Sequence, residues 1–84
     1  MVYVYVLQSA VDRKLYTGCT RDLRLRLDLH NIGKVESTAD RRPLNLIYYE
    51  ACISEKDAFR REKYLKTTYG KRYIKTRCRA YFTG

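Results

Sequence analysis

The first strand-like segment of the chain limits the possible folds more than any other feature. From Val2 to Gln8, valines alternate with two tyrosines and a leucine. Because successive side chains of a strand point to opposite faces, this pattern predicts a strand that is covered on both faces. Residues 10–13 offer a turn, and Lys14 to Thr20 predicts the returning strand of a β-hairpin.

Four further segments have recognisable patterns. Leu44 to Cys52 predicts a third strand, and Pro43 marks its start. Ser54 to Lys66 predicts an amphipathic helix, and Lys71 to Tyr81 predicts a last basic helix or a partly ordered tail. Gly33 to Arg42 is polar and basic, which indicates a loop.

The segment from Leu23 to His30 gives conflicting signals. Its strict alternation of leucine with polar residues is typical of a strand. Thr20 as an N-cap, Asp22 in the first turn and the glycine that follows the segment favour a helix, as do leucine and arginine, which lack β-branching. We predict a helix. Arg26 and His30 share one face under either interpretation, because they are four residues apart.

The composition indicates a nucleic-acid partner. The 84 residues suit one small domain, and 18 Lys and Arg against 9 Asp and Glu give a net charge of +9. No apolar run approaches the ~20 residues needed to span a membrane, and the N-terminus lacks the features of a signal peptide. Three widely spaced cysteines have neither disulfide-framework nor zinc-site spacing, which favours a reducing cytoplasm.

Glu62 is an acid in unusual surroundings. In the helix that Ser54 is expected to cap, the predicted apolar stripe consists of Ala58, Phe59 and Leu65, and Glu62 falls inside it. The other charges of the helix are expected on the opposite side. A carboxylate that points toward the body of the domain needs a cation or a hydrogen-bond donor. That cation is either an arginine or a metal ion, and a metal ion would indicate an enzyme.

Two tyrosines lie on the two arms of the predicted hairpin. Tyr5 and Tyr16 emerge from the same face if the connecting loop has an even number of residues. Gly18 follows Tyr16 by two residues and is expected to leave that face open, since a strand glycine often marks the close approach of a ligand or another backbone.

These residue types suit phosphodiester hydrolysis, which needs an activated water and a cation on the phosphate. Arg26 could bind phosphate oxygens through its planar fork, and His30 could relay a proton. A tyrosine can act as a base only if its pKa falls well below about 10. A single carboxylate, such as that of Glu62, suits Mg²⁺, which keeps several waters and takes other ligands from substrate phosphate.

Each candidate also has an ordinary structural explanation. Strand tyrosines mostly pack in a core, and a lone histidine such as His30 is commonly a helix-end or surface residue. Arg26 could be an exposed helix charge, and Glu62 could pair with Lys66 at i, i+4. Composition and pattern alone therefore predict only a small basic α/β nucleic-acid binder.

A resemblance to a known family makes the hydrolytic interpretation more specific. The two tyrosine segments, eleven residues apart at Tyr5 and Tyr16, resemble the two half-motifs of the GIY-YIG nuclease superfamily. Arg26 stands ten residues past the second tyrosine, as in the family's first helix, and His30 stands where members often have His or Tyr. The resemblance extends over essentially the whole chain and is greatest to small, single-domain bacterial members. The matching segments are Val4–Val6, Leu15–Gly18, Thr20–Asn31, Arg41–Glu50 and Phe59–Lys63.

The resemblance implies an α+β fold in which a three-stranded antiparallel sheet is flanked by helices, in one domain over residues 1–84. It implies one Mg²⁺ or Mn²⁺ ion on Glu62, Arg26 on the phosphate, and Tyr5 or Tyr16 helping to activate the water. The expected activity is structure-directed endonucleolytic hydrolysis of DNA, with RNA left open as a substrate. The alternative is a non-catalytic nucleic-acid-binding module that retains the fold.

The sequence departs from the family pattern at two points. The first half-motif lacks its glycine, although both half-motifs keep the tyrosine. Cys19 stands where some members have a lysine that helps to lower the tyrosine pKa. Besides the catalytic candidates, Gly18, Arg41 and Arg42 are expected to contact the nucleic acid.

Overall fold

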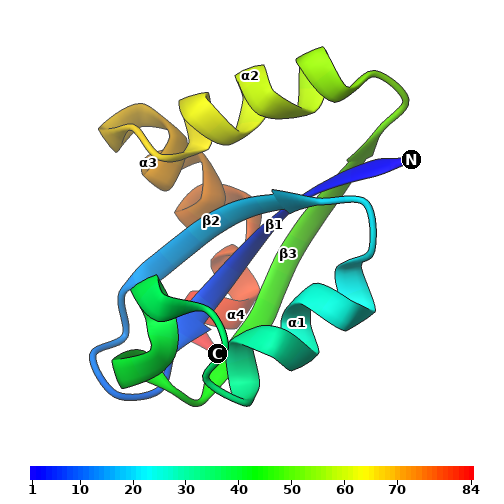
Figure 1. Cartoon of the computed structure of the whole chain (residues 1–84). Helices are drawn as coiled ribbons and strands as arrows, with labels where there is room; N and C mark the ends of the chain where they lie inside the picture. The colour runs from blue at the N-terminus through cyan, green and yellow to red at the C-terminus, as the bar shows by residue number, and fades with distance from the viewer.

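The chain folds into a three-stranded antiparallel sheet with helices on both faces, the α+β arrangement that the sequence predicts (Figure 1). The computed structural model describes all residues from 1 to 84. The strands are β1 (Val2–Ser9), β2 (Leu15–Thr20) and β3 (Leu44–Cys52). β1 lies in the centre, because it pairs with β2 on one side and with β3 on the other. The predicted hairpin and third strand are both confirmed.

The chain forms four α-helices and one short 3-10 helix. No helix is long and apolar enough to cross a membrane. The interpretation of residues 23–30 as a helix is confirmed, and the last basic segment is also helical, so the alternative of a partly ordered tail is wrong. The expected loop at residues 33–42 contains a short 3-10 helix. The full set is α1 (Leu23–Asn31) and the 3-10 helix η1 (Glu36–Arg41), then α2 (Glu55–Leu65), α3 (Thr68–Arg77) and α4 (Arg79–Thr83).

Helices cover β1 on both faces, as the alternation of its residues predicts. Its valines form one core with Ala58, Leu65 and Ile74 from α2 and α3. On the opposite face, Tyr5 and Leu7 form a second core, against which leucines of α1 and β3 pack. Figure 1 shows α2 and α3 on one side of the sheet and α1 on the other. The tyrosines of the two half-motifs therefore face α1, whereas α2 covers the opposite face of the sheet.

The ends of α1 explain why a segment that alternates like a strand becomes a helix. The carboxylate of Asp22 accepts a hydrogen bond of 3.1 Å from the backbone N–H of Leu25, so Asp22 is the N-cap. The prediction of Thr20 as the cap is wrong, because its hydroxyl accepts from the N–H of Asp22 instead. Gly33 has a φ of 82°, a left-handed conformation that ends the helix.

Two close contacts fix α1 and α3 against their neighbours. The amide of Asn31 donates to the backbone oxygen of Leu44 (3.0 Å) and accepts from its N–H (2.9 Å), which holds the end of α1 at the start of β3. Gly70 lies in the first turn of α3, where a Cβ would overlap the backbone of Leu65. The absence of a side chain at Gly70 therefore lets α3 pack directly on α2.

Candidate active site

Tyr5 and Tyr16 lie on the same face of the sheet. Tyr5 pairs with Gly18 across the β1–β2 ladder, and Leu7 pairs with Tyr16. Directly opposed residues of an antiparallel pair point to the same side, so all four positions share the face that α1 covers. The ring centroids of the two tyrosines are 6.4 Å apart. The prediction that both rings emerge from one face is confirmed.

Arg26 and His30 reach the two tyrosines from α1. The Nε of Arg26 donates to the hydroxyl of Tyr5 at 3.4 Å, and Nε2 of His30 lies 2.9 Å from the same hydroxyl. The ring of Tyr16 lies 5.1 Å from that of His30, measured between centroids. The structure therefore brings together four of the five catalytic and metal-binding candidates, which we call the tyrosine cluster: Tyr5, Tyr16, Arg26 and His30.

A threonine that sequence analysis missed determines the orientation of His30. Thr38 in η1 is fully buried, and its hydroxyl oxygen lies 2.7 Å from Nδ1 of His30. Because the Thr38 hydroxyl donates to the backbone oxygen of Val35, we assign the proton of the ring to Nδ1, which donates to Thr38. Nε2 is then free to accept the hydrogen bond of Tyr5.

His30 is neutral in this site. It is completely buried, and burial together with the positive charge of Arg26 lowers its pKa from 6.5 to about 4. A buried neutral imidazole accepts the hydrogen bond of Tyr5, and its low pKa means that it binds a second proton weakly at neutral pH. His30 therefore holds the Tyr5 hydroxyl in the resting protein, and its role as a proton relay stays a prediction.

The two tyrosines differ in their access to substrate. Tyr5 is 1% exposed, and burial raises the pKa of its hydroxyl, an effect that the hydrogen bond from Arg26 only partly opposes. Tyr16 is half-buried at the margin of the cluster. Tyr5 is thus a protonated donor inside the protein, whereas the Tyr16 ring reaches the surface.

The space next to Gly18 is filled by a side chain of the protein itself. A Cβ at this position would overlap the hydroxyl oxygen and ring of Tyr5, which crosses from β1 over Gly18. The prediction that Gly18 leaves the face open for nucleic acid is therefore wrong. The missing side chain makes room for Tyr5, and no sequence signal distinguishes this use of a strand glycine from contact with a ligand.

Glu62 lies on the other side of β2 from the tyrosine cluster. Its carboxylate forms an ion pair of 3.0 Å with Lys66, four residues along α2, and 22% of its side chain is exposed. The i, i+4 pair with Lys66 that the spacing suggested is therefore confirmed. Glu62 is nevertheless close enough for its charge to raise the pKa of both Tyr5 and Cys19, although burial contributes more in each case.

Cys19 shares the side of Glu62 and not that of the tyrosines. It pairs with Val4 in the ladder and packs against the valine core under α2. A side chain at this position therefore points away from the tyrosine cluster.

The residues present suit a hard divalent cation at Glu62. No group of three or more His, Cys, Asp and Glu side chains gathers anywhere in the chain, so a protein-only cage is absent. A single carboxylate with oxygen ligands from water and substrate phosphate is a donor set that Mg²⁺ accepts. Lys66 already places a positive charge on this carboxylate, and its side chain is 55% exposed, so it can move aside.

The predicted inward and outward faces of α2 are wrong at two positions. Phe59 is 53% exposed and does not belong to the buried stripe. Arg61 points inward, where its guanidinium makes two-point contact with Glu50 of β3 at 2.9 Å and stacks over the rings of Tyr64 and Tyr73. The inward-facing charges of α2 are thus Arg61, whose partner is partly buried, and Glu62, whose partner is exposed.

Arg41 and Arg42 do not act together. Arg41 faces the β1–β2 turn, with its Nε 3.4 Å from the carboxylate of Asp12. Arg42 packs against Gly33 and donates through Nε to the backbone oxygen of Ala39 at 2.7 Å. Of the two arginines expected to contact nucleic acid, only Arg41 lies beside other basic side chains.

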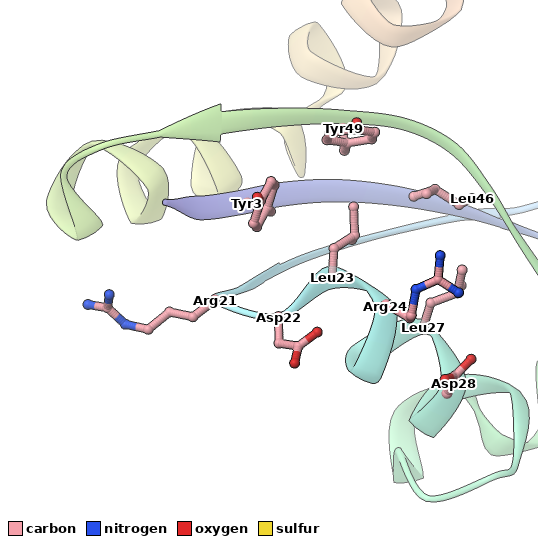
Figure 2. Close-up of a pocket in the computed structure, with 9 residues that line it drawn as sticks. All are labelled: Tyr3, Arg21, Asp22, Leu23, Arg24, Leu27, Asp28, Leu46 and Tyr49. Carbon is pink, nitrogen blue, oxygen red and sulfur yellow. The ribbon is translucent and has the colours of Figure 1, made fainter.

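The hollow drawn in Figure 2 lies on the opposite side of α1 from the tyrosine cluster. Tyr3 and Tyr49 of the sheet and Arg24 of α1 are among its lining residues. Leu23 and Leu27 pack between this hollow and the cluster, because they occupy the middle of the helix face that lies on the sheet. None of the chemical groups of the cluster opens into it.

Comparison with known proteins gives the family of this fold, and the family indicates a nuclease-type domain. The chain belongs to the GIY-YIG family, since the family model described as the GIY-YIG catalytic domain matches residues 1–76. A UPF0213 protein of Streptococcus pyogenes serotype M5 is 46% identical over 65 residues, which cover 76% of this chain and 70% of that protein. A UPF0213 protein of serotype M1 aligns equally well.

A solved structure supports the same assignment. The solution NMR structure of the UPF0213 protein BH0048 from Bacillus halodurans shares 32% sequence identity with this chain. The match covers 90% of this chain and 84% of that protein, with a TM-score of 0.57. The predicted family and the predicted fold are therefore both confirmed.

Proposed function

We propose that this protein is a metal-dependent endonuclease that hydrolyses phosphodiester bonds in DNA. The observation that carries the proposal is the convergence of Tyr5, Arg26 and His30 on one hydroxyl, beside Tyr16, in a GIY-YIG domain. The net charge of +9 and the free cysteines suit a cytoplasmic protein that binds a polyanion.

Arg26 is the residue assigned to the scissile phosphate. Its Nε donates to Tyr5 and its guanidinium also interacts more weakly with the Tyr16 hydroxyl, so the terminal amino groups lie where they can donate to two phosphate oxygens beside Tyr16. The pKa of Arg26 is raised above its ordinary value, chiefly by the hydrogen bond with Tyr5, and its charge is permanent. A fixed cation of this kind stabilises the negative charge that develops in the transition state.

We assign Tyr16 as the tyrosine that contacts substrate, and Tyr5 as a positioning residue. Tyr5 is buried and its proton is committed to His30, whereas Tyr16 lies at the surface of the same face. Tyr16 is therefore placed to orient the attacking water. His30 and Thr38 hold Tyr5, and Tyr5 in turn holds the Nε of Arg26.

Glu62 would hold one Mg²⁺ or Mn²⁺ ion together with waters and phosphate oxygens. When bound, such an ion draws charge from the phosphate and makes a bound water more acidic. Recognition would follow nucleic-acid structure, because contacts from basic side chains to the backbone carry no sequence information.

A panel of substrates tests the proposal. Wild-type protein with Mg²⁺ or Mn²⁺ should cut at least one of duplex, nicked, flap or single-stranded DNA, and an RNA arm tests the other polymer. Glu62→Ala should abolish cutting and keep binding, since it removes from the fold only one i, i+4 ion pair, whose lysine is 55% exposed. The matched control is Glu55→Ala, which removes the other ion-paired glutamate of α2 and should still cut.

A second function is favoured by the charge alone, namely non-catalytic binding of nucleic acid. It predicts binding without cleavage across the whole panel. A wild type that binds but never cuts, with either metal, would decide in its favour.

A further inference from the structure

We propose that a basic pocket beside the β1–β2 turn binds a backbone phosphate that neighbours the one to be cut. This inference rests on the proposed function, because it assigns the path that the nucleic acid takes to the tyrosine cluster. We call this site the turn pocket. It has a volume of about 470 Å³, and its lining residues are Arg13, Lys14, Leu15, Arg41, Lys71 and Lys75.

The turn pocket is assembled from three distant parts of the chain. The hairpin turn and the start of β2 contribute three lining residues, η1 contributes Arg41, and α3 contributes Lys71 and Lys75. Leu15 of its wall is the immediate neighbour of Tyr16 along β2. Leu15 packs toward the valine core whereas Tyr16 faces α1, because successive side chains of a strand point to opposite faces. Since β2 is an edge strand, a strand of nucleic acid that follows this edge can contact both the tyrosine cluster and the turn pocket.

The charges of the turn pocket are unbalanced. Five of its six lining residues are cationic and none is acidic. Lys71 and Lys75 lie at i, i+4 on α3, where like charges repel and destabilise a helix. The acidic side chain that forms an ion pair with a residue of the pocket is Asp12, and its partner is Arg41. The packing of the fold gives no reason for this concentration of charge, whereas a bound phosphate would neutralise it.

One donor in the pocket has no acceptor. The Nε of Arg41 is buried and makes no hydrogen bond, although the carboxylate of Asp12 lies 3.4 Å away, out of line for one. A buried N–H without an acceptor costs free energy in the isolated protein. A phosphate oxygen entering the pocket would supply acceptors for a guanidinium that the protein itself leaves incompletely bonded.

The backbone of the β1–β2 turn is strained at Arg13 and is fixed by hydrogen bonds. Arg13 has a φ of 64°, a left-handed conformation that ordinarily favours glycine. The amide of Gln8 donates to the backbone oxygen of Arg13 at 3.0 Å, and the hydroxyl of Ser9 accepts from the backbone N–H groups of Val11 and Asp12. An arginine is thus kept where glycine would be less strained, which supports a use for its charge.

The shape of the site favours a nucleic-acid backbone over a membrane surface. Leu15 is the only apolar residue in the lining, so no apolar surface surrounds the cations for insertion among lipids. A concave cationic site beside the start of β2, the edge strand that also carries Tyr16, fits an extended polyanion. The ligand is therefore a phosphodiester of the same strand.

Two pocket variants test the inference by fluorescence anisotropy with duplex and single-stranded DNA, without metal, between 50 and 200 mM salt. Lys71→Ala/Lys75→Ala should weaken binding about five- to tenfold and lower the slope of log affinity against log salt by about one. Arg13→Gly should weaken binding too, yet melt no lower than wild type, because glycine relieves the strained φ. Its loss of affinity cannot then come from misfolding.

The matched control is Lys56→Ala/Arg79→Ala, which removes two exposed cations that make no ion pair or side-chain hydrogen bond. Its salt slope should equal that of wild type. Wild-type affinity and slope in both pocket variants would overturn the inference, as would absence of nucleic-acid binding by the wild type. Loss of binding to phosphatidylserine vesicles with unchanged DNA binding would also overturn it. A wild type that binds through the pocket but cuts nothing defeats only the proposed function.

Discussion

Gly18 lies directly beneath the hydroxyl of Tyr5, in the space where any other residue would place its Cβ. Tyr5 crosses from the central strand over the edge strand, and its hydroxyl meets Arg26 and His30 there. The position of this hydroxyl, and with it the Nε of Arg26, therefore depends on the absence of a side chain two residues past Tyr16.

Gly18→Ala should destabilise the protein by about 1–3 kcal/mol, because the Tyr5 ring must move to admit a methyl group. Tyr5→Phe removes the hydroxyl but leaves the ring in place, so it should cost less. Urea unfolding of the two variants gives the comparison. The close fit of Gly18 and Tyr5 would be disproved if Gly18→Ala were as stable as wild type.

Tyr16→Phe should abolish cleavage while leaving the unfolding midpoint close to that of wild type, since Tyr16 is half-buried and the interaction of its hydroxyl with Arg26 is weaker than that of Tyr5. Single-turnover cleavage at saturating enzyme measures the chemical step. Tyr5→Phe is the matched comparison and should retain more of the rate. If Tyr16→Phe cuts normally and Tyr5→Phe does not, the two roles are reversed.

His30 should make stability depend on pH. In the unfolded chain it takes up a proton near pH 6.5, whereas the folded protein keeps it neutral until about pH 4. The stability that neutral His30 contributes is thus fully present above pH 6.5 and is lost as the pH falls to about 4, by about 3 kcal/mol in total.

The comparison is His30→Gln, which cannot titrate. Denaturant unfolding at intervals from pH 7 to pH 4.5 should show a steeper loss for wild type than for the variant. The carboxyls of Asp12 and Glu50 have lowered pKa values, so they act mainly at lower pH. Parallel curves for the two proteins would mean that His30 takes up its proton as readily in the folded protein as in the unfolded chain.

Glu50→Gln should destabilise the protein by about 1–2 kcal/mol. Burial alone would raise the pKa of Glu50, but hydrogen bonds from Arg61 and Tyr48 outweigh it and leave the pKa below its ordinary value. The variant leaves Arg61 partly buried without its anion. Glu55→Gln, in the exposed pair with Arg21, should cost at most a few tenths of a kcal/mol by the same urea assay.

Local sequence patterns predict the elements of this fold well and the contacts between them poorly. The strands over Val2–Ser9 and Leu44–Cys52 follow from alternation and flanking turns, and α1 follows from its end signals. Asp22 displaced Thr20 as the cap because the Thr20 hydroxyl bonds the N–H of Asp22, a choice within three residues that propensities cannot resolve.

In the site, too, local rules predict some positions and miss the contacts between elements. Tyr16, Arg26 and His30 could be placed together because hairpin register and the i, i+4 spacing of a helix are local rules. Thr38 could not be found, since nothing in residues 33–42 signals that one hydroxyl is buried against a histidine. The inward turn of Arg61 likewise depends on Glu50, which lies on another element.

The buried hydroxyl of Thr38 limits how the segment between α1 and β3 can change. Irregular connections commonly tolerate insertions and deletions. Here a change of length between Gly33 and Thr38 would withdraw the acceptor of Nδ1, free the imidazole to exchange its tautomer, and turn Tyr5 from donor to acceptor at Nε2. The spacing of the residues between Gly33 and Thr38 thus fixes the proton of Tyr5 on the central strand.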